Sequence, residues 1–204
     1  MKLFGLLSAL GLVLMSTNAW SYGTGISSYP IMLQQRFISA EFTGITSTGG
    51  GVGVQGRYTQ KFNTNMIFDG GIGMGGGDRS SRIFAGVDFE LYPDYQKQPR
   101  ISVKGTINNA KEGDSRKTSL GVAPTFSKGF SFWGHEAYPF VAIPFNVSLD
   151  SNNSTYNTNA NLNIGIAGAV PVDGFKHLTA TFEGTINIKD SYTGLFLGVA
   201  YPFN

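Results

Sequence analysis

The stretch that decides the fold is GLFLGVAYPFN, residues 194–204. Its apolar side chains fall on every second position: Leu195, Leu197, Val199, Tyr201 and Phe203. Alternate side chains of a β-strand share one face, so this face would be wholly apolar and would end on aromatic rings. Such a face needs a cover in water, whereas a strand that faces lipid needs none.

The same alternation recurs in nine earlier segments, and no stretch shows a convincing helical period. The ten predicted strands cover residues 31–43, 51–62, 66–76, 82–92, 100–109, 119–126, 141–149, 159–170, 178–189 and 194–204. Strands of about 10–12 residues, tilted by about 40°, rise about 28 Å, which matches the apolar band of a bilayer. The sequence therefore predicts an all-β chain that forms a single closed antiparallel transmembrane β-barrel of ten strands.

Two prolines disturb this pattern. Pro124 and Pro144 fall inside neighbouring predicted strands, where each removes a hydrogen bond from the ladder. Either bulges occur at these positions, or the strand boundaries differ and the barrel has eight strands.

The ending Tyr201-Pro202-Phe203 resembles the last strand of Gram-negative outer-membrane β-barrel proteins, which commonly reads Tyr-x-Phe. Asn204 departs from that pattern, because these proteins usually end on the aromatic residue itself. Residues 22–204 as a whole resemble the small single-chain barrels of the porin-like and OmpA-type superfamily. The resemblance implies an outer-membrane location, folding from the periplasm, and a last strand that the assembly machinery recognises. Its implied partners are outer-membrane lipids, periplasmic chaperones and that machinery, and we expect a monomer.

The N-terminus has the composition of a secretory signal peptide. Lys2 supplies the positive charge, residues 3–15 are mostly apolar, and the small residues that follow offer cleavage after Ser21 or after Ala19. The apolar stretch is shorter than the about 20 residues that a transmembrane helix needs. We expect residues 1–21 to be removed and residues 22–204 to form one barrel domain.

The composition argues against several other classes of protein. Fifteen basic and thirteen acidic residues give a net charge of +2, which gives no electrostatic basis for binding nucleic acid. The chain has no cysteine, and its two histidines, His135 and His177, lack the spacing of metal ligands. The glycine-rich stretch 71–76 matches a dinucleotide-binding motif, but no helix follows it. We therefore expect no metal and no cofactor.

The polar faces of the strands carry five acids and six bases: Glu41, Arg57, Lys61, Asp69, Arg82, Asp88, Glu90, Arg100, Lys104, Glu183 and Lys189. Turned outward into lipid, each mid-plane Arg or Lys would cost about 2–4 kcal/mol. We expect these residues to face the interior, pair across it, and leave it plugged or very narrow. The alternative is a soluble barrel of the lipocalin type, which would leave the aliphatic face exposed.

The connections alternate between the two ends of the predicted barrel. Those predicted to be extracellular are rich in Gly, Ser, Thr, Asn and Asp: residues 43–50, 76–81, 110–116, 150–157 and 190–194. The stretch 127–137 carries Phe130, Phe132 and Trp133, which we expect at the inner membrane interface.

Three functions fit this architecture. The first is a structural or surface-interaction barrel with a charge-filled lumen, the second a narrow diffusion pore, and the third an outer-membrane enzyme. No histidine falls in a predicted extracellular connection, and Asp88 and Glu90 lie among basic residues that would hold them in ion pairs. We therefore expect the protein not to be an enzyme.

Overall fold

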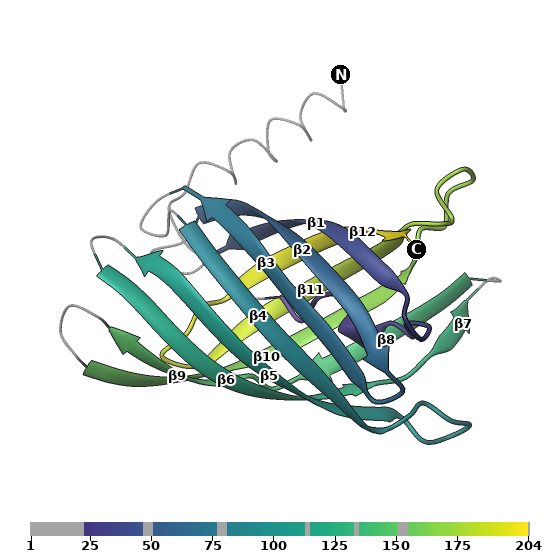
Figure 1. The fold of residues 1–204 in the computed structure, drawn as a ribbon, viewed down its shortest axis with the longest axis horizontal. Coiled ribbons are helices and arrows are strands. Elements are labelled where there is room, and N and C mark those ends of the chain that lie inside the picture. Colours follow the sequence, from purple (N-terminus) through teal and green to yellow (C-terminus); the bar gives the residue numbers. More distant parts are fainter. Residues whose placement is uncertain are drawn as a thin grey trace.

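A computed structural model shows one antiparallel sheet that is rolled up and closed on itself (Figure 1). The structure describes residues 23–46, 51–76, 81–112, 115–132, 135–150 and 155–203. The predicted signal peptide, Trp133 and Asn204 lie outside these ranges.

The strands are β1 (Arg36–Ile45), β2 (Gly51–Asn63), β3 (Met66–Gly75), β4 (Ser81–Tyr92), β5 (Arg100–Glu112), β6 (Ser115–Ser127), β7 (Phe130–Phe132), β8 (His135–Ala142), β9 (Phe145–Asp150), β10 (Thr155–Ala169), β11 (Thr179–Lys189) and β12 (Gly194–Phe203). A single 3-10 turn, η1 (Gly25–Ser28), precedes them. Within the described ranges, no helix has the length and the apolar character needed to cross a membrane.

The wall of the barrel has ten strand positions, as the sequence predicted. β1 pairs with β2 on one side and with β12 on the other, and β10 pairs with β11, so the sheet has no open edge. β8 and β9 together fill one position between β6 and β10. β7 is a short partner of β8 outside this count. The alternative of eight strands is therefore wrong.

The break between β8 and β9 falls at Ile143 and Pro144, where the missing amide of proline interrupts the ladder. Main-chain bonds nevertheless hold the neighbouring strands at this point. Ile143 N donates to Pro124 O at 3.0 Å, and Asn161 N donates to Pro144 O at 3.0 Å. Pro124 itself stays within β6, opposite Val103 of β5. Pro144 thus divides one strand position into β8 and β9, while β6 continues through Pro124 and the number of strand positions stays at ten.

Burial alternates along the strands, with the apolar side chains outside. In β1, Ile38 is 57% exposed and the adjacent Ser39 is 2% exposed. In β12, Leu195 and Leu197 are exposed while Phe196 between them is fully buried. This orientation is opposite to that of a lipocalin-type barrel, because the exposed face of the wall is the aliphatic one.

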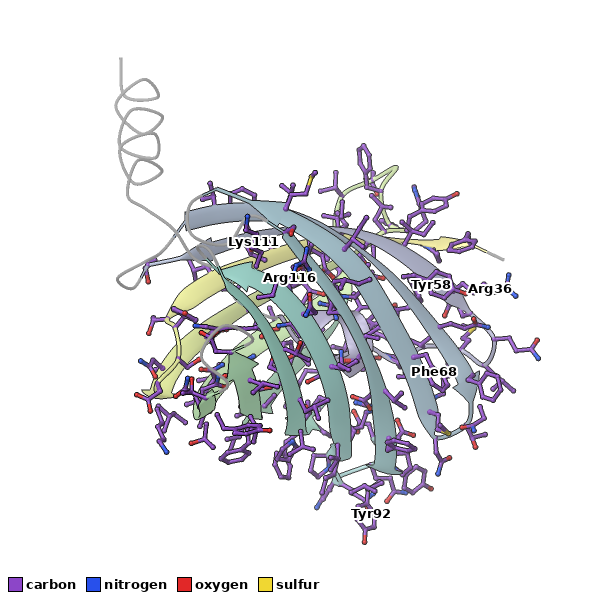
Figure 2. All side chains as sticks on the ribbon, turned by 60° about the vertical axis from the view of Figure 1, so that its left-hand side comes forward. Arg36, Tyr58, Phe68, Tyr92, Lys111 and Arg116 are labelled. Carbon is purple, nitrogen blue, oxygen red and sulfur yellow. The ribbon has the colours of Figure 1, made fainter. Side chains whose placement is uncertain are left out.

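The two ends of the barrel differ. Strands β1, β3, β5, β9 and β11 all finish at one end of the barrel, which we call the loop end. The opposite end, which we call the C-terminal end, holds the tight turn after Asn63 and the end of β12 (Figure 1). Figure 2 turns the loop end toward the reader, with Lys111 of β5 and Arg116 of β6 at it.

Candidate functional site

Eight of the predicted charged residues are buried, each at most 6% exposed: Glu41, Arg57, Asp69, Arg82, Asp88, Arg100, Lys104 and Glu183. They come from β1, β2, β3, β4, β5 and β11, so neighbouring strands and the opposite wall both contribute. They form two groups, which we call the Arg57 network and the Arg100 cluster.

Arg57 is the centre of the Arg57 network. Its Nε donates to Glu41 Oε1 at 2.8 Å, and its Nη1 donates to Asp69 Oδ2 at 2.7 Å. Its Nη2 donates to the main-chain oxygen of Gly23 at 2.9 Å. Two carboxylates and one carbonyl thus surround a guanidinium that is 2% exposed. Buried charges need this degree of pairing, because leaving one unpaired costs several kcal/mol.

Lys104 and Glu183 extend the network across the barrel. Lys104 Nζ pairs with Asp69 and also donates to Thr24 O at 3.0 Å. Glu183 accepts hydrogen bonds from Thr24 N at 2.7 Å and from Asn163 Nδ2 at 2.6 Å. Strands β5 and β11 therefore both bind Thr24, and this residue connects the two walls.

The Arg100 cluster is a separate group on β4 and β5. Arg100 Nη2 donates to Asp88 Oδ1 at 2.8 Å and Nε donates to Glu90 Oε2 at 2.6 Å. Ser102 binds both Arg100 and Asp88. Asp88 and Glu90 are thus held by one guanidinium, as the sequence predicted for ion-pair members. Within the described residues, no group of three or more His, Cys, Asp or Glu side chains has an arrangement that would hold a metal ion.

A glycine in the motif-like stretch 71–76 makes room for an aromatic ring between two arginines. A Cβ on Gly71 would lie 2.2 Å from Gly56 O and 2.6 Å from the Phe84 ring. The ring centroid of Phe84 in turn lies 4.9 Å from the guanidinium carbon of Arg57 and 4.8 Å from that of Arg82. The stretch therefore contributes packing space beside long basic side chains, and cation–π contact adds to the stability of the network.

The filling of the interior by the chain's own N-terminal segment was not predicted. Residues 23–28, which include η1, are all buried inside the barrel. Gly25 has a φ of +72°, and a Cβ there would lie 2.9 Å from the Arg57 guanidinium. A Cβ on Gly23 would lie 2.3 Å from the Phe196 ring. The signal in the sequence was the run of glycine and small hydroxyl residues, which is the composition that fits such a narrow space.

The segment closes the C-terminal end of the barrel with apolar side chains. Ile26 and Ile31 pack against wall residues Phe37, Ile67 and Ala200. Tyr29 makes an edge-on contact with Tyr138, with ring centroids 5.4 Å apart. We call residues 23–31 the plug, because they bridge the charged middle of the interior and its apolar base.

Three predicted residues are not fully buried. Glu90 joins the Arg100 cluster while half-buried, and Lys61 is half-buried near the end of β2. Lys189 is exposed, since the pairing of β10 with β11 shifts by one residue: Asn161 lies opposite Asn187, whereas Ala160 lies opposite Lys189. This bulge turns Lys189 to the outer side, where its Nζ donates to Thr158 Oγ1 at 2.9 Å. The expectation that Lys189 faces the interior is therefore wrong.

Tyr201 and Phe203 belong to a band of aromatic side chains around the C-terminal end. Phe203 lies 6.2 Å from Tyr58, and Phe62 lies 5.6 Å from Phe68, between ring centroids. Figure 2 shows Tyr58, Phe68 and Tyr92 on the outer side of the wall, away from Lys111 and Arg116. Further exposed rings in this band are Phe89 and Phe126.

The loop end of the interior contains a cavity of about 370 Å³. It lies between β5, β6, β9, β10 and the connection 190–193, and we call it the amide chamber because five asparagines line it: Asn108, Asn146, Asn157, Asn159 and Asn161. Asn108 Oδ1 accepts from Arg82 Nε at 2.7 Å, so the Arg57 network and its neighbours form the floor.

These observations define the class of protein as a closed ten-stranded antiparallel β-barrel with an apolar outer wall and a charged, plugged interior. No protein-family model matches the sequence, and no curated protein matches it either.

Proposed function

We propose that the protein is an integral barrel of a bacterial outer membrane, with a filled lumen and a structural or surface-interaction role. The observation that carries the proposal is the orientation of the wall, which exposes aliphatic side chains while burying eight charged residues. In water, an uncovered apolar belt of this extent would drive aggregation, whereas in a bilayer it is the stable arrangement.

Strand length and the aromatic band support the same proposal. The wall strands other than β8 and β9 have 10 to 15 residues, which is long enough to cross the apolar band when they are tilted. Aromatic rings gather at membrane interfaces, and here they surround the C-terminal end of the barrel. The proposal includes export by a signal peptide over residues 1–21 and a periplasmic position for the C-terminal end.

The filled lumen separates this proposal from a diffusion pore. Arg57 and Lys104 both bind main-chain oxygens of the plug, and Glu183 binds a plug amide from the opposite wall. Ions crossing the barrel would have to displace this segment and break its charged bonds. We therefore expect no steady conductance and no catalytic role.

Membrane insertion is tested first, by heat-modifiable migration of the refolded protein on SDS gels. A monomer that extracts without detergent would overturn the membrane location. Conductance in planar bilayers then tests the lumen, with the intact barrel expected to be silent and a variant lacking residues 23–31 expected to show unitary openings. Stable openings of the intact barrel that change with Arg57→Met or Lys104→Met would refute the filled lumen and favour a narrow pore. Hydrolysis of lipid or peptide that is lost in Asp88→Asn or Glu90→Gln would instead indicate an enzyme.

A further inference from the structure

The amide chamber has hydrogen-bonding groups that the protein itself does not use. Within the described ranges, the side-chain amides of Asn146, Asn157, Asn159 and Asn161 make no hydrogen bond to another residue. Asn161 Oδ1 is also shielded from solvent. Polar groups in protein interiors are nearly always paired, so four unused amides around one cavity favour a polar partner, water or solute, that occupies the cavity.

The asparagines are placed by the strand pattern. Asn157, Asn159, Asn161 and Asn163 fall on alternate positions of β10, and Asn163 donates to Glu183 at the floor. On the opposite side, Asn146 lies across Gly121, where a Cβ would come within 1.9 Å of Asn146 Oδ1. Glycine at position 121 thus leaves the space that this amide occupies against the wall.

The chemistry of the lining selects the class of ligand. Each carboxamide offers two donors and an acceptor, which complements hydroxyl groups that both donate and accept. Among the described residues of the lining, Lys117 and Asp190 carry charge, and their charges cancel. Tyr192 adds an aromatic ring at the rim. At about 370 Å³, the chamber is at the lower end of the range of small-molecule sites.

We propose that the amide chamber is a blind binding site for a neutral mono- or disaccharide that enters from the loop end. The inference deepens the proposed surface-interaction role and rests on it. The plug and the Arg57 network close the interior beneath the chamber, so the sugar binds and leaves by the same opening and does not cross the barrel.

Binding is tested on the full refolded barrel in detergent, by saturation-transfer NMR with glucose, galactose, N-acetylglucosamine, maltose and lactose up to about 50 mM, well above the millimolar range of a weak site. We expect saturable binding of at least one of these sugars, weakened about tenfold or more in Asn161→Ala and in Asn146→Ala. Asn109→Ala is the matched control, because Asn109 binds Thr118 and Arg116 and does not line the chamber. Its affinity should equal that of the unmodified barrel.

Heat-modifiable migration of each variant confirms that it has refolded. Gly121→Ala gives an independent perturbation, since it displaces the Asn146 amide without removing it. Absence of saturable binding for every sugar, or equal binding by the Asn161 and Asn109 variants, would overturn the inference. A barrel that is silent in bilayers yet binds no sugar would keep the filled-lumen proposal, whereas a conducting barrel would refute that proposal whatever the sugar result.

Discussion

Replacement of Arg57 by methionine tests whether the interior is as dry as its burial indicates. Methionine keeps much of the side-chain volume but removes the charge from two carboxylates at 2.8 and 2.7 Å and the hydrogen bond to Gly23 O. Removing one partner of a buried ion pair typically costs about 3–5 kcal/mol, because the other charge stays buried without compensation. Lys104 continues to neutralise Asp69, so most of the loss should come from Glu41.

The measurement is the free energy of unfolding in urea of the barrel refolded into lipid vesicles. We expect a loss of about 3–5 kcal/mol for Arg57→Met and a smaller loss for the double variant Glu41→Gln with Arg57→Met, because the unpaired carboxylate is then absent. Lys189→Met is the control, and its exposed side chain should change stability by no more than about 0.5 kcal/mol. A loss below about 1 kcal/mol for Arg57→Met would mean that water solvates the two carboxylates and that the interior is not filled.

Four further substitutions, in two matched pairs, test the wall. Leu197→Arg puts a charge on the exposed face of β12 and should cost about 2–4 kcal/mol in vesicles, whereas Tyr156→Arg near the loop end should cost at most about 1 kcal/mol. Equal losses in the same urea assay would mean that the outer wall does not lie at different depths in lipid. Gly71→Val should destabilise the barrel by about 1–3 kcal/mol, since its Cβ would overlap Gly56 O and the Phe84 ring. Gly56→Val, which has open space at its Cβ, should fold normally, and a comparable loss there would show that the overlap at Gly71 does not cause the effect.

The wall of the barrel was predictable because alternation is a local property of the sequence. Val54 and Gln55 adjoin in the chain, and their opposite exposure follows from the pleat alone. Pairing with a neighbouring strand can interrupt this alternation of exposure, and the residues around the interruption need not indicate it. Nothing beside Lys189 reveals the one-residue shift against β10 that turns it outward. Pro144 indicated in the sequence that the ladder would be interrupted there. Whether the strand would still hold its place between its neighbours depended on the hydrogen bonds to Pro124 and Asn161, which the sequence does not show.

The plug could not be predicted from the sequence, for a different reason. Thr24 binds Glu183, 159 residues later in the chain, and no pattern within residues 23–31 identifies that partner. The sequence does contain an acid, Glu183, and a base, Lys104, that lie on opposite walls of the interior. Both need hydrogen-bonding partners between the walls, and main-chain groups can supply them. Glu183 accepts the Thr24 amide while Lys104 donates to the Thr24 carbonyl, so a single peptide segment satisfies both walls.

The position of the plug explains why the amide chamber lies at the loop end. Ile26 and Ile31 fill the C-terminal end with apolar side chains, and the charged middle closes on Thr24, so the plug reaches no further than the network. Beyond it, neutral Asn and Ser side chains dominate the lining of the walls. A barrel meant to conduct would need a continuous polar path, whereas this interior changes from amide to ion pair to aliphatic packing along its axis. We propose that such a gradient admits a polar solute from one side and stops it at the network, as expected of a binding site that is closed at one end.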